Sequence, residues 1–138
     1  MPRYRVMDHT ADLGVYFYGA TPEEVLINAG AVLFELMLSG KPRSGDIQKT
    51  VILEGLDLED LLVRWLSELL YFFSVRKEVM TGAEIKSLSS TRLEARIKLA
   101  PFDPATQALK MEIKAPTYHQ LELKPREAGW RARVIFDL

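Results

Sequence analysis

The sequence contains no cysteine, which excludes disulfide bonds, thiolate zinc sites and thiol nucleophiles. No apolar run approaches the roughly 20 residues that a membrane-spanning helix needs, and the first residues lack the apolar core of a signal peptide. Neither sign of charge dominates, because 18 basic and 19 acidic side chains leave a net charge of −1. Such a chain has no overall field that would capture nucleic acid. These absences predict a cytoplasmic protein with neither a membrane nor DNA as a partner.

Several catalytic signatures are missing as well. The sequence has no Walker loop for phosphate, no Gly-x-Ser-x-Gly nucleophile elbow and no His-Glu-x-x-His zinc motif. It contains only two histidines. An enzyme with its own covalent chemistry is hard to build from these residues, so the sequence predicts no catalytic residue.

The sequence does contain enough apolar residues for one folded domain. Hydrophobic residues make up 48% of its 138 positions, and this length is close to the usual size of a domain. No repeat, low-complexity tract or flexible linker divides it. We therefore expect a single domain over residues 1–138. Two helices among about seven strands predict an α+β fold, with the helices packed on mixed or antiparallel sheets.

Two segments have the spacing of helices. Thr21 is suited to cap a helix over residues 22–38, with Glu24 at the capping-box position. Asp57 can cap a second helix over residues 58–77, where apolar residues recur at helical spacing. The aromatic residues of this second helix are Trp65, Tyr71, Phe72 and Phe73. Base stacking is conceivable for them, but aromatic residues at this period predict core packing.

Alternation of apolar and polar residues predicts the strands. They are expected over residues 3–7, 13–18, 48–55, 79–88, 91–99, 109–123 and 130–136. A proline cannot donate a backbone hydrogen bond, so Pro116 should interrupt its strand or lie at a bulge or a sheet edge.

Acidic residues and a histidine are concentrated between the first two predicted strands. Asp8, His9, Thr10 and Asp12 fall within five positions. Carboxylates are hard oxygen ligands for calcium or magnesium, and a histidine beside them can act as a base, a ligand or a hydrogen-bond partner. The alternative is that the short polar side chains only organise the turn. Spacing alone does not choose between these hypotheses.

Polar residues also interrupt apolar strands near the end of the chain. Asp137 follows an apolar run and lies beside the terminal carboxylate, so a bound cation would offset the repulsion between them. An exposed, screened tail is the alternative. Lys114 is either an ordinary charge on an edge strand or a cation placed near an anionic partner. His119 has the residue type of a catalyst, but a histidine in this setting is more often a structural hydrogen-bonding residue.

Taken together, these segments resemble the archease family over nearly the full length of the chain. The opening motif is similar to residues 9–14, which read His-Thr-Ala-Asp-Leu-Gly. The central motif is similar to residues 114–119, Lys-Ala-Pro-Thr-Tyr-His, and the ending to residues 133–138, Arg-Val-Ile-Phe-Asp-Leu. Residues 62–70 of the second predicted helix add a fourth match in the same order.

The resemblance implies a non-enzymatic activator of the RtcB-type RNA ligase, which acts in tRNA splicing and RNA repair. Such an activator promotes guanylylation and multiple turnover of the ligase and broadens the nucleotides that the ligase uses. Some family members are described as modulators of tRNA methylation. RNA would then be met only through the ligase. The implied fold is a compact α+β domain similar to that of a redox-regulated heat-shock chaperone.

The resemblance also implies a divalent metal site, usually described with calcium. Its ligands map onto Asp12, Asp137 and Leu138, of which the last can offer only backbone or terminal-carboxylate oxygens. Calcium favours six to eight oxygens, so three residues leave positions for water or a partner. His9 would support this shell, and Asp8 becomes a turn residue. Lys114 would approach a phosphate or a carboxylate of the ligase, and His119 is a further supporting or partner-contacting candidate.

Two other functions remain open at this point. In a small metal-dependent phosphoester hydrolase, His9 would be the base, while Asp12 and Asp137 held the metal that activates water. An RNA-binding or chaperone-like module is the second alternative, although an analogy of fold is weak support for it. The basic residues that suggest such a module are Lys110, Lys114, Lys124, Arg126, Arg131 and Arg133.

Overall fold

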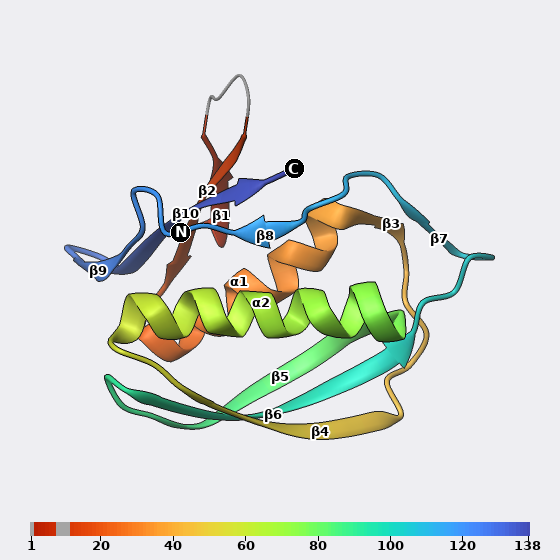
Figure 1. The fold of residues 1–138 in the computed structure, drawn as a ribbon, viewed down its shortest axis with the longest axis horizontal. Coiled ribbons are helices and arrows are strands. Elements are labelled where there is room, and N and C mark those ends of the chain that lie inside the picture. Colours follow the sequence, from red (N-terminus) through yellow and green to blue (C-terminus); the bar gives the residue numbers. More distant parts are fainter. Residues whose placement is uncertain (1, 8–11) are drawn as a thin grey trace.

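The computed structural model of the chain describes residues 2–7 and 12–138. Its described residues form two helices and ten strands, rather than about seven strands. The additional strands are short pieces of two or three residues that the alternation does not indicate. The α+β fold class is confirmed, because two helices pack on antiparallel sheets (Figure 1).

The larger sheet has five strands and is centred on the last one. β10 (Gly129–Asp137) pairs along one edge with β2 (Leu13–Gly19), which in turn pairs with β1 (Tyr4–Val6). Its other edge is shared by β8 (Ala115–Pro116) and β9 (Glu122–Arg126). All these pairings are antiparallel. The first two predicted strands therefore do flank the acidic segment, as the sequence indicated.

The smaller sheets come from the middle of the chain. β4 (Ile47–Glu54), β6 (Arg92–Pro101) and β5 (Glu78–Leu88) form a three-stranded antiparallel sheet in that spatial order. A separate two-stranded pair joins β3 (Leu38–Gly40) to β7 (Gln107–Leu109).

The first helix, α1 (Pro22–Met37), begins where the sequence indicated. The hydroxyl of Thr21 accepts a hydrogen bond from the Glu24 N–H at 3.1 Å, which satisfies one of the free donors at the helix start. The Glu24 carboxylate bonds to the N–H of Ala20 at 3.2 Å, one residue ahead of the position in a capping box. The helix ends at Met37, one residue early, because the chain passes directly into β3.

The second helix, α2 (Leu58–Arg76), supplies the centre of the core. Trp65 is fully buried, and its indole N–H donates to the backbone carbonyl of Leu26 at 2.8 Å, which joins the two helices. Core packing is also confirmed for Phe72 and Phe73. It is wrong for Tyr71, which is 46% exposed because it lies on the side of α2 away from the core. Within the described residues, neither helix is long and apolar enough to cross a membrane.

The two helices form a layer between the two larger sheets (Figure 1). Gly30 lets α1 approach its neighbours closely, because a Cβ there would lie 2.9 Å from side-chain atoms of Leu69 and of Met80. On the five-stranded sheet, the rings of Phe17 and Phe136 meet edge to face at a centroid distance of 6.4 Å. Each sheet therefore has an inner face on the helices and an outer face away from them.

The segment over residues 109–123 differs most from its prediction as a single interrupted strand. The N–H groups of Lys110 and Met111 donate to the carbonyl of Met37, at 2.8 and 3.3 Å, so the chain here satisfies the end of α1 instead of a sheet. Pro116 lies in the short edge strand β8, in agreement with its missing N–H.

Candidate functional site

The candidate metal residues meet at one end of the five-stranded sheet. Leu13 of β2 and Phe136 of β10 are the last registered pair, so the next residues along the two strands are Asp12 and Asp137. Residues in such positions are neighbours across an antiparallel pair and point to the same face. Because Leu13 and Phe136 are buried, the two aspartates project to the outer face, and both are exposed.

The central motif joins this end of the sheet through its backbone. The N–H of Lys114 donates to the carbonyl of Asp137 at 2.9 Å, and Ala115 is the register partner of Asp137. Lys114 is exposed, and Leu138 is 46% exposed. The structure therefore brings together Lys114, Asp12, Asp137 and Leu138, which are far apart in the sequence.

The donor set of this end suits a hard cation with few protein ligands. Asp12 and Asp137 directly follow the last registered pair of β2 and β10, and no cationic side chain of the described residues lies within ion-pairing distance of either. No cluster of three or more metal-ligating side chains occurs among residues 2–7 and 12–138. A metal held here would therefore need oxygens from Leu138, water or a partner as well. His9 and Asp8 lie outside the described residues.

His119 lies away from this end. The segment after Pro116 runs antiparallel to β10, so it moves from Asp137 toward Arg133. At its far end the guanidinium of Arg133 donates to the carbonyl of Gln120 at 2.7 Å. His119 is exposed and its N–H bonds to the hydroxyl of Thr117 at 3.3 Å.

A buried carboxylate on α2 holds the central motif in place. The hydroxyl of Tyr118 donates to Asp60 at 2.6 Å, across 58 positions of sequence, and Asp60 is only 5% exposed. The Leu56 N–H and the Arg64 guanidinium bond to the same carboxylate, each at 2.9 Å. The Tyr118 bond, followed by the Leu56 and Arg64 bonds, lowers the pKa of Asp60 to about 2. The carboxylate is therefore charged, and it raises the pKa of Tyr118.

Sequence reasoning missed this cluster, although the sequence carries a signal for it. Asp57 does cap α2, by accepting from the Asp60 N–H at 2.8 Å. Asp60, however, falls on the apolar side of the helix, between Leu58 and Leu61. An acid at a core-facing position, four residues before Arg64, indicates a buried carboxylate with a cationic partner at the helix surface.

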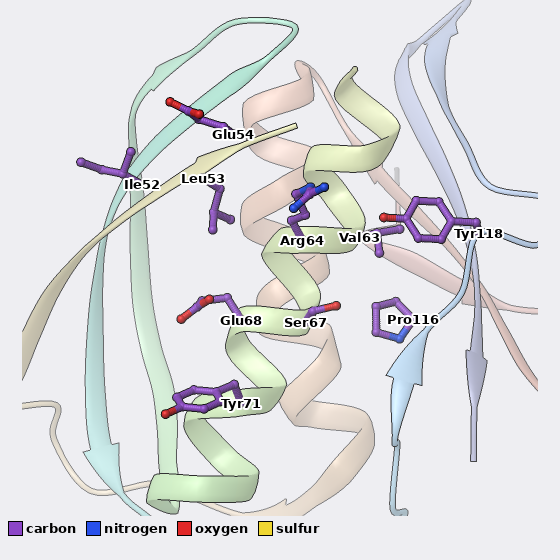
Figure 2. Close-up of a pocket in the computed structure, with 10 residues that line it drawn as sticks. All are labelled: Ile52, Leu53, Glu54, Val63, Arg64, Ser67, Glu68, Tyr71, Pro116 and Tyr118. Carbon is purple, nitrogen blue, oxygen red and sulfur yellow. The ribbon is translucent and has the colours of Figure 1, made fainter. Parts of the chain in front are cut away.

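An open groove runs beside this cluster along the exposed side of α2. Its volume is about 800 Å³. Figure 2 shows Tyr118 and Pro116 on one side of α2, and Ile52 and Glu54 of β4 on the other. A smaller hollow of about 210 Å³ is also lined by Pro116, and it extends to Lys114. The groove thus leads toward the end of the sheet that carries the two aspartates.

The basic residues proposed from the sequence do not form one free surface. Lys124, Arg131 and Arg133 all pair with the carboxylate of Glu122, with Arg133 at 2.8 Å and Arg131 at 4.0 Å. Lys114 lies at the aspartate end of the sheet, and Lys110 follows β7 near the end of α1.

Comparison with known proteins places the chain among named relatives. The model of the archease protein family (MTH1598/TM1083) matches residues 4–138. Protein archease of Methanosarcina mazei is 38% identical over 140 residues, which cover 99% of this chain and 96% of the relative. Protein archease of Pyrococcus furiosus is 30% identical, with both chains covered completely.

Solved structures agree with this result. The solution structure of protein 1598 from Methanobacterium thermoautotrophicum is 27% identical, with a TM-score of 0.79 and complete coverage of both chains. A crystal structure from Thermotoga maritima, described as an archease and possible chaperone, has a TM-score of 0.65. At 22% identity, and covering 96% of this chain and 94% of that one, it supports the fold alone. On the family match and the identities to the curated relatives, this chain belongs to the archease family.

Proposed function

We propose that this protein is a non-enzymatic activator of an RtcB-type RNA ligase, and that it acts through a divalent cation held at the end of the five-stranded sheet. The observation that supports this most directly is the register of β2 and β10, which continues into Asp12 and Asp137. The cation would be calcium or another divalent ion, with Leu138 as a third source of oxygen. The setting would be tRNA splicing and RNA repair in the cytoplasm.

Two adjacent carboxylates on an exposed edge repel one another, and a bound cation removes that repulsion. With so few protein ligands, such a cation keeps coordination positions available to oxygens of a partner. Asp12 and Asp137 would hold the ion, and the Lys114 backbone would fix Asp137 by its hydrogen bond at 2.9 Å. The exposed ammonium of Lys114 would approach a phosphate or a carboxylate of the ligase.

The groove along α2 supports a partner that is a protein. It combines exposed apolar surface at Ile52 and Tyr71 with the charged groups Arg64 and Glu68. A loop of the ligase seated there would lie beside Lys114 and the two aspartates. The bond-making chemistry belongs to the ligase in this proposal. The activator favours the state of the ligase that accepts nucleotide, and so promotes guanylylation and turnover.

Reconstitution with the ligase of the same host tests the proposal. We expect this protein to increase multiple-turnover joining of RNA ends and to speed guanylylation of the ligase. Asp12→Asn and Asp137→Asn should each abolish the stimulation, because either change removes a charged ligand without removing the side chain's volume. Both positions are exposed, so thermal unfolding of the variants should match the parent.

A matched control is Asp46→Asn, which makes the same change at an exposed loop position away from this end of the sheet. It should stimulate the ligase as well as the parent does. Equal stimulation by the parent and by both site variants would contradict the proposal. Turnover of phosphoesters by this protein without the ligase would also contradict it.

A further inference from the structure

The outer face of the five-stranded sheet carries a stacked arrangement of arginine and tyrosine. The guanidinium carbons of Arg5 and Arg131 each lie 4.6 Å from the ring centroid of Tyr16. Arg5 is the cross-strand partner of Tyr16, and Arg131 is the partner of Tyr18, one step along the same face. Cation–π contacts of this kind hold both guanidinium groups in fixed positions on the sheet.

Arg131 has hydrogen-bond donors that the described residues do not satisfy. Its side chain is 20% exposed, and its Nε is buried without a hydrogen-bond partner in the described part of the chain. Its ion-pair partner, Glu122, is 4.0 Å away, beyond hydrogen-bond distance, and also pairs with Lys124 and Arg133. Unsatisfied donors on a largely buried cation are costly. The buried Nε is closed to a ligand, but the exposed part of the Arg131 guanidinium makes no hydrogen bond to the described residues and can take an acceptor from outside.

A hollow of about 450 Å³ lies beside Arg131, where β9 and β10 form a hairpin. It is lined by the aromatic residues Tyr18 and Trp130 and by the exposed guanidinium of Arg126. Glu127 contributes one carboxylate against the two guanidinium groups. The hollow thus combines an excess of positive charge with aromatic side chains that are partly exposed.

We propose that this end of the sheet, around Tyr18, Arg126 and Arg131, binds single-stranded RNA directly. Guanidinium groups match phosphate oxygens with paired, charge-assisted hydrogen bonds. An aromatic ring beside them can stack on a base, which is the usual arrangement when proteins bind single strands. An acidic peptide would satisfy the guanidinium groups but would leave Tyr18 without a planar partner, so RNA fits the combined chemistry better.

This inference goes beyond activation of the ligase, and it amends the expectation that RNA is met only through the ligase. The site lies at the opposite end of β10 from the two aspartates, since Arg131 is near the start of the strand and Asp137 at its end. It uses few cations, and the chain as a whole has a net charge of −1, so the binding should be weak and local.

Fluorescence anisotropy of a short labelled single-stranded RNA, with this protein alone, tests the inference. Two phosphate contacts predict that raising salt from about 50 to about 200 mM weakens binding roughly sevenfold. Arg126→Gln should weaken binding at low salt and reduce its dependence on salt. Tyr18→Leu should weaken binding about fivefold or more, since base stacking on an aromatic ring is lost.

The matched control is Arg96→Gln, which removes an exposed arginine from the outer face of the other large sheet. It should bind RNA as the parent does. The same loss in Arg96→Gln and Arg126→Gln would overturn the inference, because binding would then follow total charge. Displacement of the RNA by poly-glutamate at equal charge concentration would overturn it in favour of an acidic protein surface. The ligase is absent from this assay, so its result is independent of the proposed function.

Discussion

The outer faces of the two large sheets distribute their charges in different ways. On the three-stranded sheet, acids and bases alternate at short range, as in the pairs Lys86–Glu84 at 2.6 Å and Arg92–Glu94 at 3.4 Å. On the five-stranded sheet, the carboxylates of Asp12 and Asp137 lie at one end, while toward the other end three cations share the single carboxylate of Glu122. The same layer of helices covers both inner faces, so the fold does not require this segregation.

The largest expected effects are on the inner faces, where the two sheets should be alike. Phe136→Ala in β10 should lower the free energy of unfolding by about 3–5 kcal/mol, because both the burial of the ring and its packing on Phe17 are lost. Ile97→Ala in β6, also fully buried, should cost about 2–5 kcal/mol. Urea denaturation measures both. A loss below about 1 kcal/mol for only one of them would show that the sheets differ inside as well.

The next largest effect should be a difference in stability between variants on the two outer faces. Glu122→Gln leaves Lys124, Arg131 and Arg133 without their shared carboxylate, and we expect it to destabilise the fold by about 1–2 kcal/mol. Glu94→Gln on the other sheet removes one exposed pair and should cost less than about 1 kcal/mol. Equal losses in urea denaturation would contradict the inference that Glu122 stabilises the fold by pairing with three cations at once.

A divalent cation should stabilise the folded protein by binding to the outer face of the five-stranded sheet and not to that of the three-stranded sheet. At ten times its dissociation constant, calcium should raise the free energy of unfolding by about 1.4 kcal/mol, provided that the unfolded chain does not bind it. Thermal unfolding with and without chelator measures this increase. Asp137→Asn should remove the increase, while Glu84→Gln on the three-stranded face should keep it. An increase that survives Asp137→Asn would place the cation elsewhere.

The smallest effect should come from the link that fixes the edge of the five-stranded sheet to α2. Tyr118→Phe removes the main cause of the low pKa of Asp60, so the variant should be slightly less stable at neutral pH. The folded pKa, about 2, is below the ordinary value of about 3.9. The stabilisation is therefore present above about pH 4 and lost as pH falls toward 2.

The difference between parent and Tyr118→Phe should accordingly narrow over that range in acid titrations followed by circular dichroism. Thr81→Ala, whose hydroxyl bonds to the Lys98 carbonyl at 3.4 Å, serves as a control without a titrating partner. A difference between parent and Tyr118→Phe that stays constant below pH 4 would contradict the assignment to Asp60.

Local features of the sequence were sufficient to predict much of the fold. The caps at Thr21 and Asp57 and the helical spacing after each one give the helix starts, because a cap acts within a single turn. Pro116 likewise indicated an interrupted strand or a sheet edge, because its missing N–H is a property of that residue alone. The short pair β3 and β7 could not be predicted, because strands of three residues have too little alternation and pair across a long separation.

The candidate site depended on information that local pattern does not carry. Chemistry alone left Asp12 as either a turn residue or a ligand and Asp137 as either a tail residue or a ligand. Their proximity follows from the register of two strands more than a hundred residues apart. The link between Asp60 and Tyr118 is likewise a tertiary contact, although Asp60 is visible in the sequence as an acid at an apolar position.

The length of β10 sets the distance between the two ends of the outer face for which we propose binding. From Arg131 to Asp137 an extended strand covers roughly 20 Å, at about 3.3 Å per residue. An RNA held at the Arg131 end would therefore reach a ligase docked at the aspartate end only if its unpaired part extends over several nucleotides. Stimulation of the ligase should then depend on the length of the RNA overhang, with a threshold that the protein's own backbone determines.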